Sequence, residues 1–280
     1  MNFNNYSNKE FKESDLPHNR KEVFFDTLKV RFLLYLKIGF VLFLFLLPFL
    51  GVNLYGKLLI ASYLEENGMT EEAINQASQM KTIITLFYVP AFMIFSIGLA
   101  GVMKVLRQLI WGEGVVFKDD FKSGIKQNYQ TFLTTFFIFG LVYVLDTFVS
   151  SLNLEYKFIT YIPYGVTFVF IIPVFMYILT QSILYSNKYT SFLKNSIYFF
   201  IKTVPVSLLF TLILLVLIYP INSSYLPSLW LQYSIISVVI ILIIPFFLSA
   251  KILYDFSIYD KYINIKDYPE YVDKGINRIK

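Results

Sequence analysis

The sequence of 280 residues contains no cysteine and only one histidine, His18, which lies in a polar N-terminal stretch. Without cysteine there are no disulfides, thiol nucleophiles or thiolate metal ligands. A zinc site of the usual type needs three or four histidine or cysteine ligands, and Ser/His catalysis needs a histidine beside its nucleophile. We therefore predict no metal site and no cofactor.

Charged residues make up only 15 % of the chain, whereas apolar residues make up 56 % and the mean hydropathy is +0.60. A typical soluble domain has roughly 25 % charged residues. One core of this chain length cannot bury so much apolar surface, so the remainder must face lipid. We predict an all-α, polytopic membrane protein whose partner is the lipid bilayer.

Segments of about 20 residues that are nearly free of charge recur along the chain, and a helix of that length crosses a hydrocarbon core ~30 Å thick. The charge-free stretch 203–250 is too long for one crossing, and the proline, asparagine and serine residues within 220–227 favour a turn. The pattern predicts six transmembrane helices at about 36–57, 82–104, 131–152, 158–182, 203–220 and 228–250. An N-terminal segment, 1–31, and a tail, 251–280, then flank a 32–250 transmembrane domain.

The distribution of basic residues predicts the orientation of these spans. All but three of the 24 lysines and arginines fall on one side, the exceptions being Lys57, Lys81 and Lys157. Because basic residues accumulate in short cytoplasmic loops, we predict that both termini are cytoplasmic. The net charge of +5 then reflects topology, and no nucleic acid partner is expected. The polar first thirty residues predict no cleavable signal peptide, so the first span itself directs insertion.

The predicted extracellular segment, 61–80, is polar and rich in glutamate. Thr70 precedes Glu71 and Glu72, a pattern that predicts the N-cap of a short helix. Such a segment is compatible with a small lid or with a solvated connection between spans.

The loop between the second and third predicted spans is amphipathic. Aromatic or aliphatic residues recur every four positions from Phe117 to Tyr129, with lysines beside them. This period predicts a helix that lies on the membrane surface, with its rings inward and its lysines toward anionic headgroups. A looser version over 189–205 predicts a second of these cytoplasmic amphipathic surface helices, and whether the two segments are repeats of one unit stays open.

Two further features complete this predicted surface. Trp111 is expected to anchor the chain at the membrane interface, and Arg107 and Glu113 are expected to pair with each other. The candidate surface for lipid or for a partner protein comprises Arg107, Trp111, Glu113, Phe117, Phe121, Lys122, Ile125 and Lys126.

The run from Gly98 to Glu113, followed by 117–129, resembles the YesL-like family of bacterial membrane proteins. The resemblance covers about 96–132 and rests on a helix end rich in small residues, a basic turn and an aromatic amphipathic segment. The long N-terminus, the acidic outer segment and the extended tail depart from the family pattern. The resemblance implies a location in the bacterial cytoplasmic membrane and a link to carbohydrate uptake systems, but no catalytic residue. Physically, Gly98, Ala100 and Gly101 are expected to allow close helix approach.

Asp146 is the only acidic residue within the predicted spans, so a pair of facing catalytic carboxylates is not expected. Five residues from the outer end of its span, it lies about 8 Å deep. We predict a structural hydrogen bond to the fourth helix, from residues such as Tyr161 or Tyr164, with a proton- or cation-coupled site as the alternative.

These features predict a non-enzymatic accessory or assembly subunit that binds another membrane protein, such as the subunits of a carbohydrate uptake transporter. The alternative is a secondary transporter or channel for a small solute. This alternative draws on the prolines within the spans, since broken helices build substrate sites in transporters. They are Pro48, Pro90, Pro163, Pro173 and Pro245.

Overall fold

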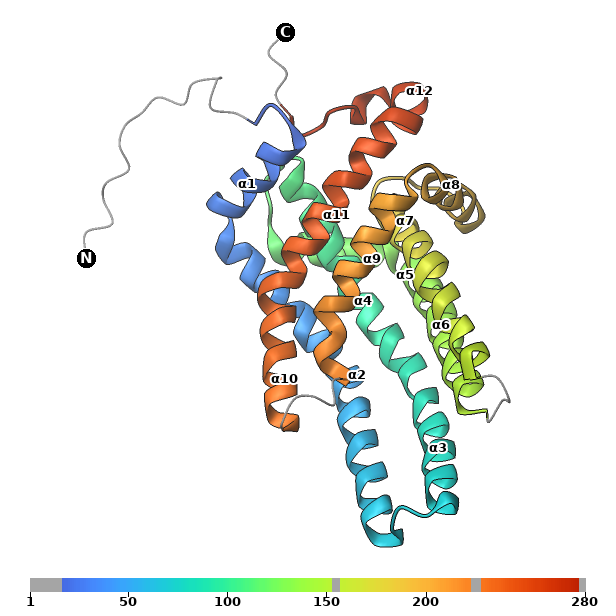
Figure 1. Ribbon diagram of the computed structural model, residues 1–280. Coiled ribbons are helices and arrows are strands. Elements are labelled where there is room, and N and C mark those ends of the chain that lie inside the picture. The colour runs from blue at the N-terminus through green and yellow to red at the C-terminus, as the bar shows by residue number, and fades with distance from the viewer. Residues whose placement is uncertain (1–16, 153–156, 223–227, 277–280) are drawn as a thin grey trace, which may run out of the picture.

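The computed structural model describes residues 17–152, 157–222 and 228–276. Across these residues the secondary structure is helical, with no strand, and six helices are long and apolar enough to cross a membrane. Figure 1 shows them side by side as a bundle. The prediction of an all-α, polytopic membrane protein with six spans is confirmed. The predicted turn at 220–227 lies largely outside the described residues, which resume at Ser228.

The described residues form a series of helical segments, and most of these segments combine into the six spans. The segments are α1 (Arg20–Val30), α2 (Phe32–Asn67), α3 (Glu71–Leu86), α4 (Tyr88–Ile110), α5 (Phe117–Ser151), η2 (Lys157–Tyr161), α6 (Ile162–Val166), η3 (Thr167–Ile171), α7 (Ile172–Ser182), α8 (Tyr189–Lys202), α9 (Val204–Ile218), η4 (Tyr219–Asn222), α10 (Leu229–Val238), η5 (Val239–Ile243), α11 (Ile244–Tyr259), η6 (Asp260–Asn264), α12 (Ile265–Asp267) and η7 (Pro269–Tyr271). The spans are α2, α3 with α4, α5, η2 to α7, α9 with η4, and α10 to α12.

The bundle has two distinct ends. The terminal end carries α1, α8 and α12 together, and the hairpin end carries the turn between α2 and α3 (Figure 1). The first and last described segments meet at the terminal end, where the Arg20 guanidinium donates to the Lys274 carbonyl at 2.7 Å. An even number of spans requires this arrangement.

The hairpin end is more helical than the polar composition of 61–80 suggests. α2 continues to Asn67, the chain turns at Gly68 with φ of 70°, and α3 begins at Glu71. The Thr70 hydroxyl accepts from the Ala73 amide at 3.2 Å, so the predicted cap is confirmed. With 36 residues, α2 is about 54 Å long and exceeds the thickness of a hydrocarbon core.

The segment 117–129 is not the separate surface helix that its period predicts. It forms the first turns of α5, which runs without a break from Phe117 to Ser151. No proline or glycine pair separates the amphipathic segment from the apolar one, so a single helix continues through both. The apolar face of this segment therefore packs on neighbouring helices.

Small residues bring α4 into close contact with its neighbours, as predicted. A Cβ on Gly98 would lie 2.3 Å from the Phe45 ring, and one on Gly101 would lie 2.5 Å from the Phe121 ring. On the facing helix, a Cβ on Gly124 would lie 3.0 Å from the Ala100 carbonyl oxygen. Without these glycines the helices would have to separate, with loss of their packing.

Two of the prolines in the spans coincide with local widening of a helix. Pro173 follows the π-helical segment η3, and Pro245 follows the π-helical segment η5. Proline has no N–H to bond the carbonyl four residues earlier, and the helix adjusts its hydrogen bonding around that gap. For Pro245 the residue four positions earlier is Ile241. Its carbonyl oxygen lies against Gly39 of α2, where a Cβ on Gly39 would lie only 1.9 Å from that oxygen.

The predicted boundary at residue 250 does not hold. The last helix passes through Lys251 and continues to Asp267, and Lys251, Asp255 and Tyr259 are all buried. A charged residue ended the predicted span, but here a carboxylate one turn later neutralises it. The first part of the predicted tail is therefore a packed part of the bundle.

Candidate functional site

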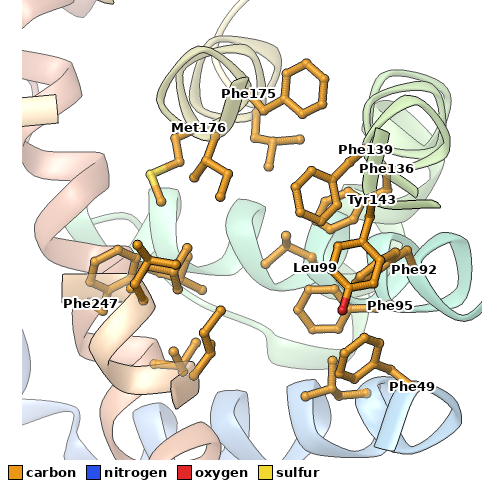
Figure 2. A pocket seen from close by; sticks show the side chains of 18 of the residues that line it. Phe49, Phe92, Phe95, Leu99, Phe136, Phe139, Tyr143, Phe175, Met176 and Phe247 are labelled. Carbon is orange, nitrogen blue, oxygen red and sulfur yellow. The ribbon is translucent and has the colours of Figure 1, made fainter. Parts of the chain in front are cut away.

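A cavity of about 610 Å³ lies inside the bundle, between α2, α4, α5, α7, α9 and α11. Figure 2 shows its aromatic side chains, which point from several helices into one central space; they include Phe49, Phe92, Phe95, Phe136, Phe139 and Phe175. Pockets for small molecules measure roughly 300–1,000 Å³ and are mostly apolar with a few polar groups. The cavity matches that description.

The cavity follows the bundle axis over much of the membrane thickness. Tyr164 and Thr180 both line it, and 16 helical residues rise about 24 Å. Its wall on one side is α9, the least buried of the six spans: 17 % of its most apolar window is buried, against 28–44 % in the others. The exposed residues Ile218 and Tyr219 lie both on this wall and on the surface of the bundle.

The aromatic rings of the wall hold one another in place. The Phe92 ring lies 5.1 Å from that of Phe49, 5.2 Å from that of Phe139 and 6.0 Å from that of Tyr143, measured between centroids. The last two pairs are edge-to-face, a geometry that the ring quadrupole favours. This side of the cavity is preformed.

Asp146 is one of two charged residues that the described part of the chain places on the cavity wall. It is 2 % exposed and accepts a hydrogen bond from the Thr167 hydroxyl at 2.7 Å. The predicted hydrogen bond to the fourth span is thus present, but its donor is not one of the tyrosines that the sequence suggested. Tyr161 is exposed, and the Tyr164 hydroxyl lies 3.4 Å from those of Thr147 and Ser150.

Lys251 is the other of these charged residues on the wall, although the sequence pattern places it in the predicted tail, 251–280. Its ammonium group contacts both carboxyl oxygens of Asp255, with 2.6 Å to Oδ2, and lies 4.0 Å from the Tyr177 ring centroid. The Thr180 hydroxyl donates to the same carboxylate at 2.7 Å. A lysine with an aspartate four residues later in an apolar helix was the signal that could have identified this buried pair.

Hydroxyl groups surround this ion pair and connect three helices. Thr180 is hydrogen-bonded to Tyr259 at 2.5 Å, and the Tyr177 hydroxyl is hydrogen-bonded to Thr203 at 2.7 Å and to Ser207 at 3.2 Å. A buried ion pair needs such additional hydrogen bonds, because its desolvation is costly. The cluster joins α7, α11 and the start of α9 at the terminal end of the cavity.

The predicted surface around Trp111 is covered by the chain itself. Trp111 is buried, with the Tyr271 ring at 5.3 Å and the Lys274 ammonium 3.9 Å from its centroid. Glu113 pairs with Lys274 at 3.0 Å, whereas Arg107 donates to the Ile183 carbonyl at 2.9 Å. The expected pairing of Arg107 with Glu113 and the interfacial exposure of Trp111 are therefore corrected. The C-terminal segment, 268–276, covers Trp111 and pairs with Glu113, while the Ile183 carbonyl binds Arg107.

Further contacts hold this C-terminal segment. Arg20 of α1 pairs with Asp260 at 2.6 Å. Gly275 has a φ of 84° and lies against the Ile110 carbonyl, so a Cβ on Gly275 would lie 2.3 Å from that oxygen. The Tyr185 ring packs on Tyr268 and Tyr271 of this segment. Burial, and to a lesser degree the charge of Asp260, raises the pKa of the Tyr185 phenol, which stays protonated and donates to Asn264.

The remaining predicted surface residues lie on the first turns of α5. Phe117, Phe121 and Ile125 are half-buried, while Lys122 and Lys126 are exposed. The division into two faces is as expected from the sequence, but the rings contact helices: Phe121 lies 6.0 Å from the Phe45 ring of α2. Among the described residues, no three histidine or acidic side chains gather to hold a metal ion.

Comparisons with protein-family models, with curated proteins and with solved structures find no match for this chain. The YesL-like resemblance over 96–132 therefore stays a prediction.

Proposed function

We propose that this protein is a secondary transporter for a small apolar or amphipathic solute, which binds in the aromatic cavity of the bundle. One observation carries the proposal: a cavity of about 610 Å³ with an almost entirely apolar wall that follows the bundle axis. A well-formed apolar pocket with a few convergent polar groups is the default binding site of a protein. The described wall residues form no continuous polar lining, which favours a transporter over a water-filled channel.

Two features of the helices support movement around this cavity. The π-helical segments η3 and η5 both contribute wall residues, among them Thr167 and Ile240. Such π-helical segments within α-helices are frequent at functional sites. The weakly buried α9 is the helix that can move at least cost, because few buried contacts hold it.

The accessory role expected from the sequence is the weaker proposal. Part of the predicted docking surface is covered, because the C-terminal segment contacts Trp111 through Tyr271 and pairs with Glu113 through Lys274. Carbohydrates would also find few hydrogen-bond partners in the cavity. A role as an accessory subunit in carbohydrate uptake would need this segment to move aside for a partner.

Photocrosslinking tests the proposal. The purified protein in mild detergent is irradiated with a neutral alkyl probe that carries a diazirine, and labelled peptides are located by mass spectrometry. We expect labels at inward-facing residues such as Phe95 and Met176, and their loss in Leu99→Trp, which fills the cavity. Leu141→Trp, at an exposed position of α5, is the matched control and should retain them. Labelling of outward-facing residues alone, or inward labelling unchanged by Leu99→Trp, would overturn the proposal.

We also propose that the terminal end faces the cytoplasm of a bacterial cell, as the excess of lysine and arginine favours. The chain has no cysteine, so single cysteines report topology directly. An impermeant thiol reagent applied to whole cells should label Asn75→Cys at the hairpin end and not Lys194→Cys on α8, both of which are exposed positions. The reverse pattern would invert the orientation.

A further inference from the structure

Among the described residues, two charged side chains line the cavity, and they differ in the partners that they have. Lys251 lies toward the terminal end, whereas Asp146 lies on α5 beside Thr167, toward the hairpin end. What each of them can offer to a ligand depends on the partners that it already has.

Lys251 has little left to offer a ligand. Both oxygens of Asp255 contact its ammonium group, and the face of the Tyr177 ring lies 4.0 Å away. The Asp255 carboxylate is in turn satisfied by Thr180. The pair contributes no net charge to the cavity, and an anionic ligand would have to break it.

Asp146 has no such partner. Within the described residues its polar contact is the neutral Thr167 hydroxyl at 2.7 Å, and no lysine or arginine lies within ion-pair distance. A carboxylate in an apolar, membrane-spanning site is costly unless a cation compensates it, and such a residue is a functional candidate by default. The cavity thus has one uncompensated acidic group.

The aromatic wall favours the same sign of charge. The faces of Phe and Tyr rings carry negative electrostatic potential and attract organic cations, most strongly where water is excluded. Phe92, Phe139 and Tyr143 contribute rings to the wall from α4 and α5, and the Tyr143 ring lies 6.0 Å from that of Phe92. Tyr143 lies three residues before Asp146 on the same helix, so ring and carboxylate face the same space.

We infer that the cavity binds a lipophilic monovalent organic cation, with Asp146 as its counter-ion and the aromatic rings around its apolar body. This inference rests on the proposed function and names the class of solute. A delocalised or shielded cation fits best, because it sheds its hydration at low cost on entering an apolar site. A divalent metal ion fits less well, since Asp146 is the one acidic side chain among the described residues of the wall.

Two probes of the same shape and opposite charge test the inference. Tritiated tetraphenylphosphonium and tetraphenylborate are offered to the purified protein in a scintillation proximity assay. We expect saturable binding of the phosphonium ion and at least about tenfold weaker binding of the borate, since a favourable ionic contact in an apolar site contributes more than 1.4 kcal/mol. This comparison uses the unaltered protein and does not depend on how any variant folds.

Paired variants locate the charge that discriminates. Asp146→Asn keeps the shape of the side chain and should weaken phosphonium binding by about tenfold or more. Asp119→Asn makes the same change at an exposed position of the same helix and should leave binding unaltered. Both proteins are compared by size-exclusion profile before binding is measured.

The possible failures are distinguishable. Equal binding of both probes, unchanged in Asp146→Asn, would overturn the cation inference and leave the apolar cavity as a binding site. Preferential binding of the borate would also overturn it and would assign recognition to Lys251. Binding of neither probe, together with an absence of inward crosslinks to the neutral diazirine probe, would overturn the proposed function as well.

Discussion

The terminal end and the hairpin side of the cavity are formed by the same apolar helices, yet their charged residues have different partners. The three ion pairs found in the described residues lie toward the terminal end: Arg20–Asp260, Lys251–Asp255 and Lys274–Glu113. Lys251 of one pair also lines the cavity. On the hairpin side of the cavity, by contrast, the Asp146 carboxylate accepts from the neutral Thr167 hydroxyl. Paired charges stabilise the packing of the terminal end, whereas an unpaired charge beside a large cavity is suited to a ligand. Mutations at the two places should therefore differ in kind.

The largest effect is expected where a pair is broken. Lys251→Met leaves the Asp255 carboxylate buried without its cation, and loss of one partner of a buried pair costs about 3–5 kcal/mol of the free energy of unfolding. Thermal unfolding in detergent, followed by circular dichroism, measures the loss. The double variant Lys251→Met/Asp255→Leu removes both charges and should recover most of it. A single variant as stable as the parent would show that the terminal end does not depend on this pair.

The next largest loss of stability is expected where α4 and α5 pack closely, between Gly101 and Phe121. Phe121→Asp would place a carboxylate between Gly101 and the Phe45 ring, at a cost of about 3 kcal/mol through lost packing and desolvation. Lys122→Gln, at the neighbouring exposed position, should cost about 1 kcal/mol or less. Unfolding by denaturant compares the two variants. Equal losses would contradict the packing of α5 on α4.

The sequence was sufficient to predict the membrane class and the number of spans, because both depend on local hydropathy. Its errors arose where a charge was treated as the end of a helix. Lys251 ended the predicted sixth span although Asp255 neutralises it one turn later, and the lysines of 117–129 separated a surface helix from a span that the structure joins. A local window contains no information on whether a charge is paired.

The site was predictable only in part, for the same reason. Asp146 stood out as the one acidic residue in a predicted span, and the fourth span does supply its hydrogen bond. The cavity was not predictable, because its wall combines residues from six spans and depends on how they pack. The contact of Trp111 with Lys274 joins positions more than 160 residues apart, which no periodicity reports.

A smaller effect is expected at the C-terminal segment, which packs on Trp111 and on the Ile110 carbonyl at the end of α4. Gly275→Ala would force a side chain into a backbone of φ 84° and against the Ile110 carbonyl, at a cost of about 1–3 kcal/mol. We expect faster limited proteolysis after Lys274 with an unchanged unfolding temperature of the spans. Gly114→Ala is the matched control, because no atom lies within 4 Å of its added Cβ and its φ is ordinary. Equal proteolysis of both variants would place the segment off the bundle.

The smallest effect on stability is expected at Asp146, and it gives the sharpest contrast with Lys251. Asp146→Asn keeps an acceptor for the Thr167 hydroxyl and removes a charge that no protein cation compensates, so the free energy of unfolding should change by about 1 kcal/mol or less. Asp146→Leu removes the acceptor too, and the cost of an unsatisfied hydroxyl, about 1–3 kcal/mol, is reduced if Thr167 turns to a carbonyl of its own helix. Neither change leaves a buried charge behind, whereas Lys251→Met does. Thermal unfolding of the three variants side by side should therefore rank Lys251→Met as the most damaging and Asp146→Asn as nearly neutral. If Asp146→Asn destabilised the bundle as strongly as Lys251→Met, Asp146 would be a structural anchor and the cavity would lose its candidate counter-ion.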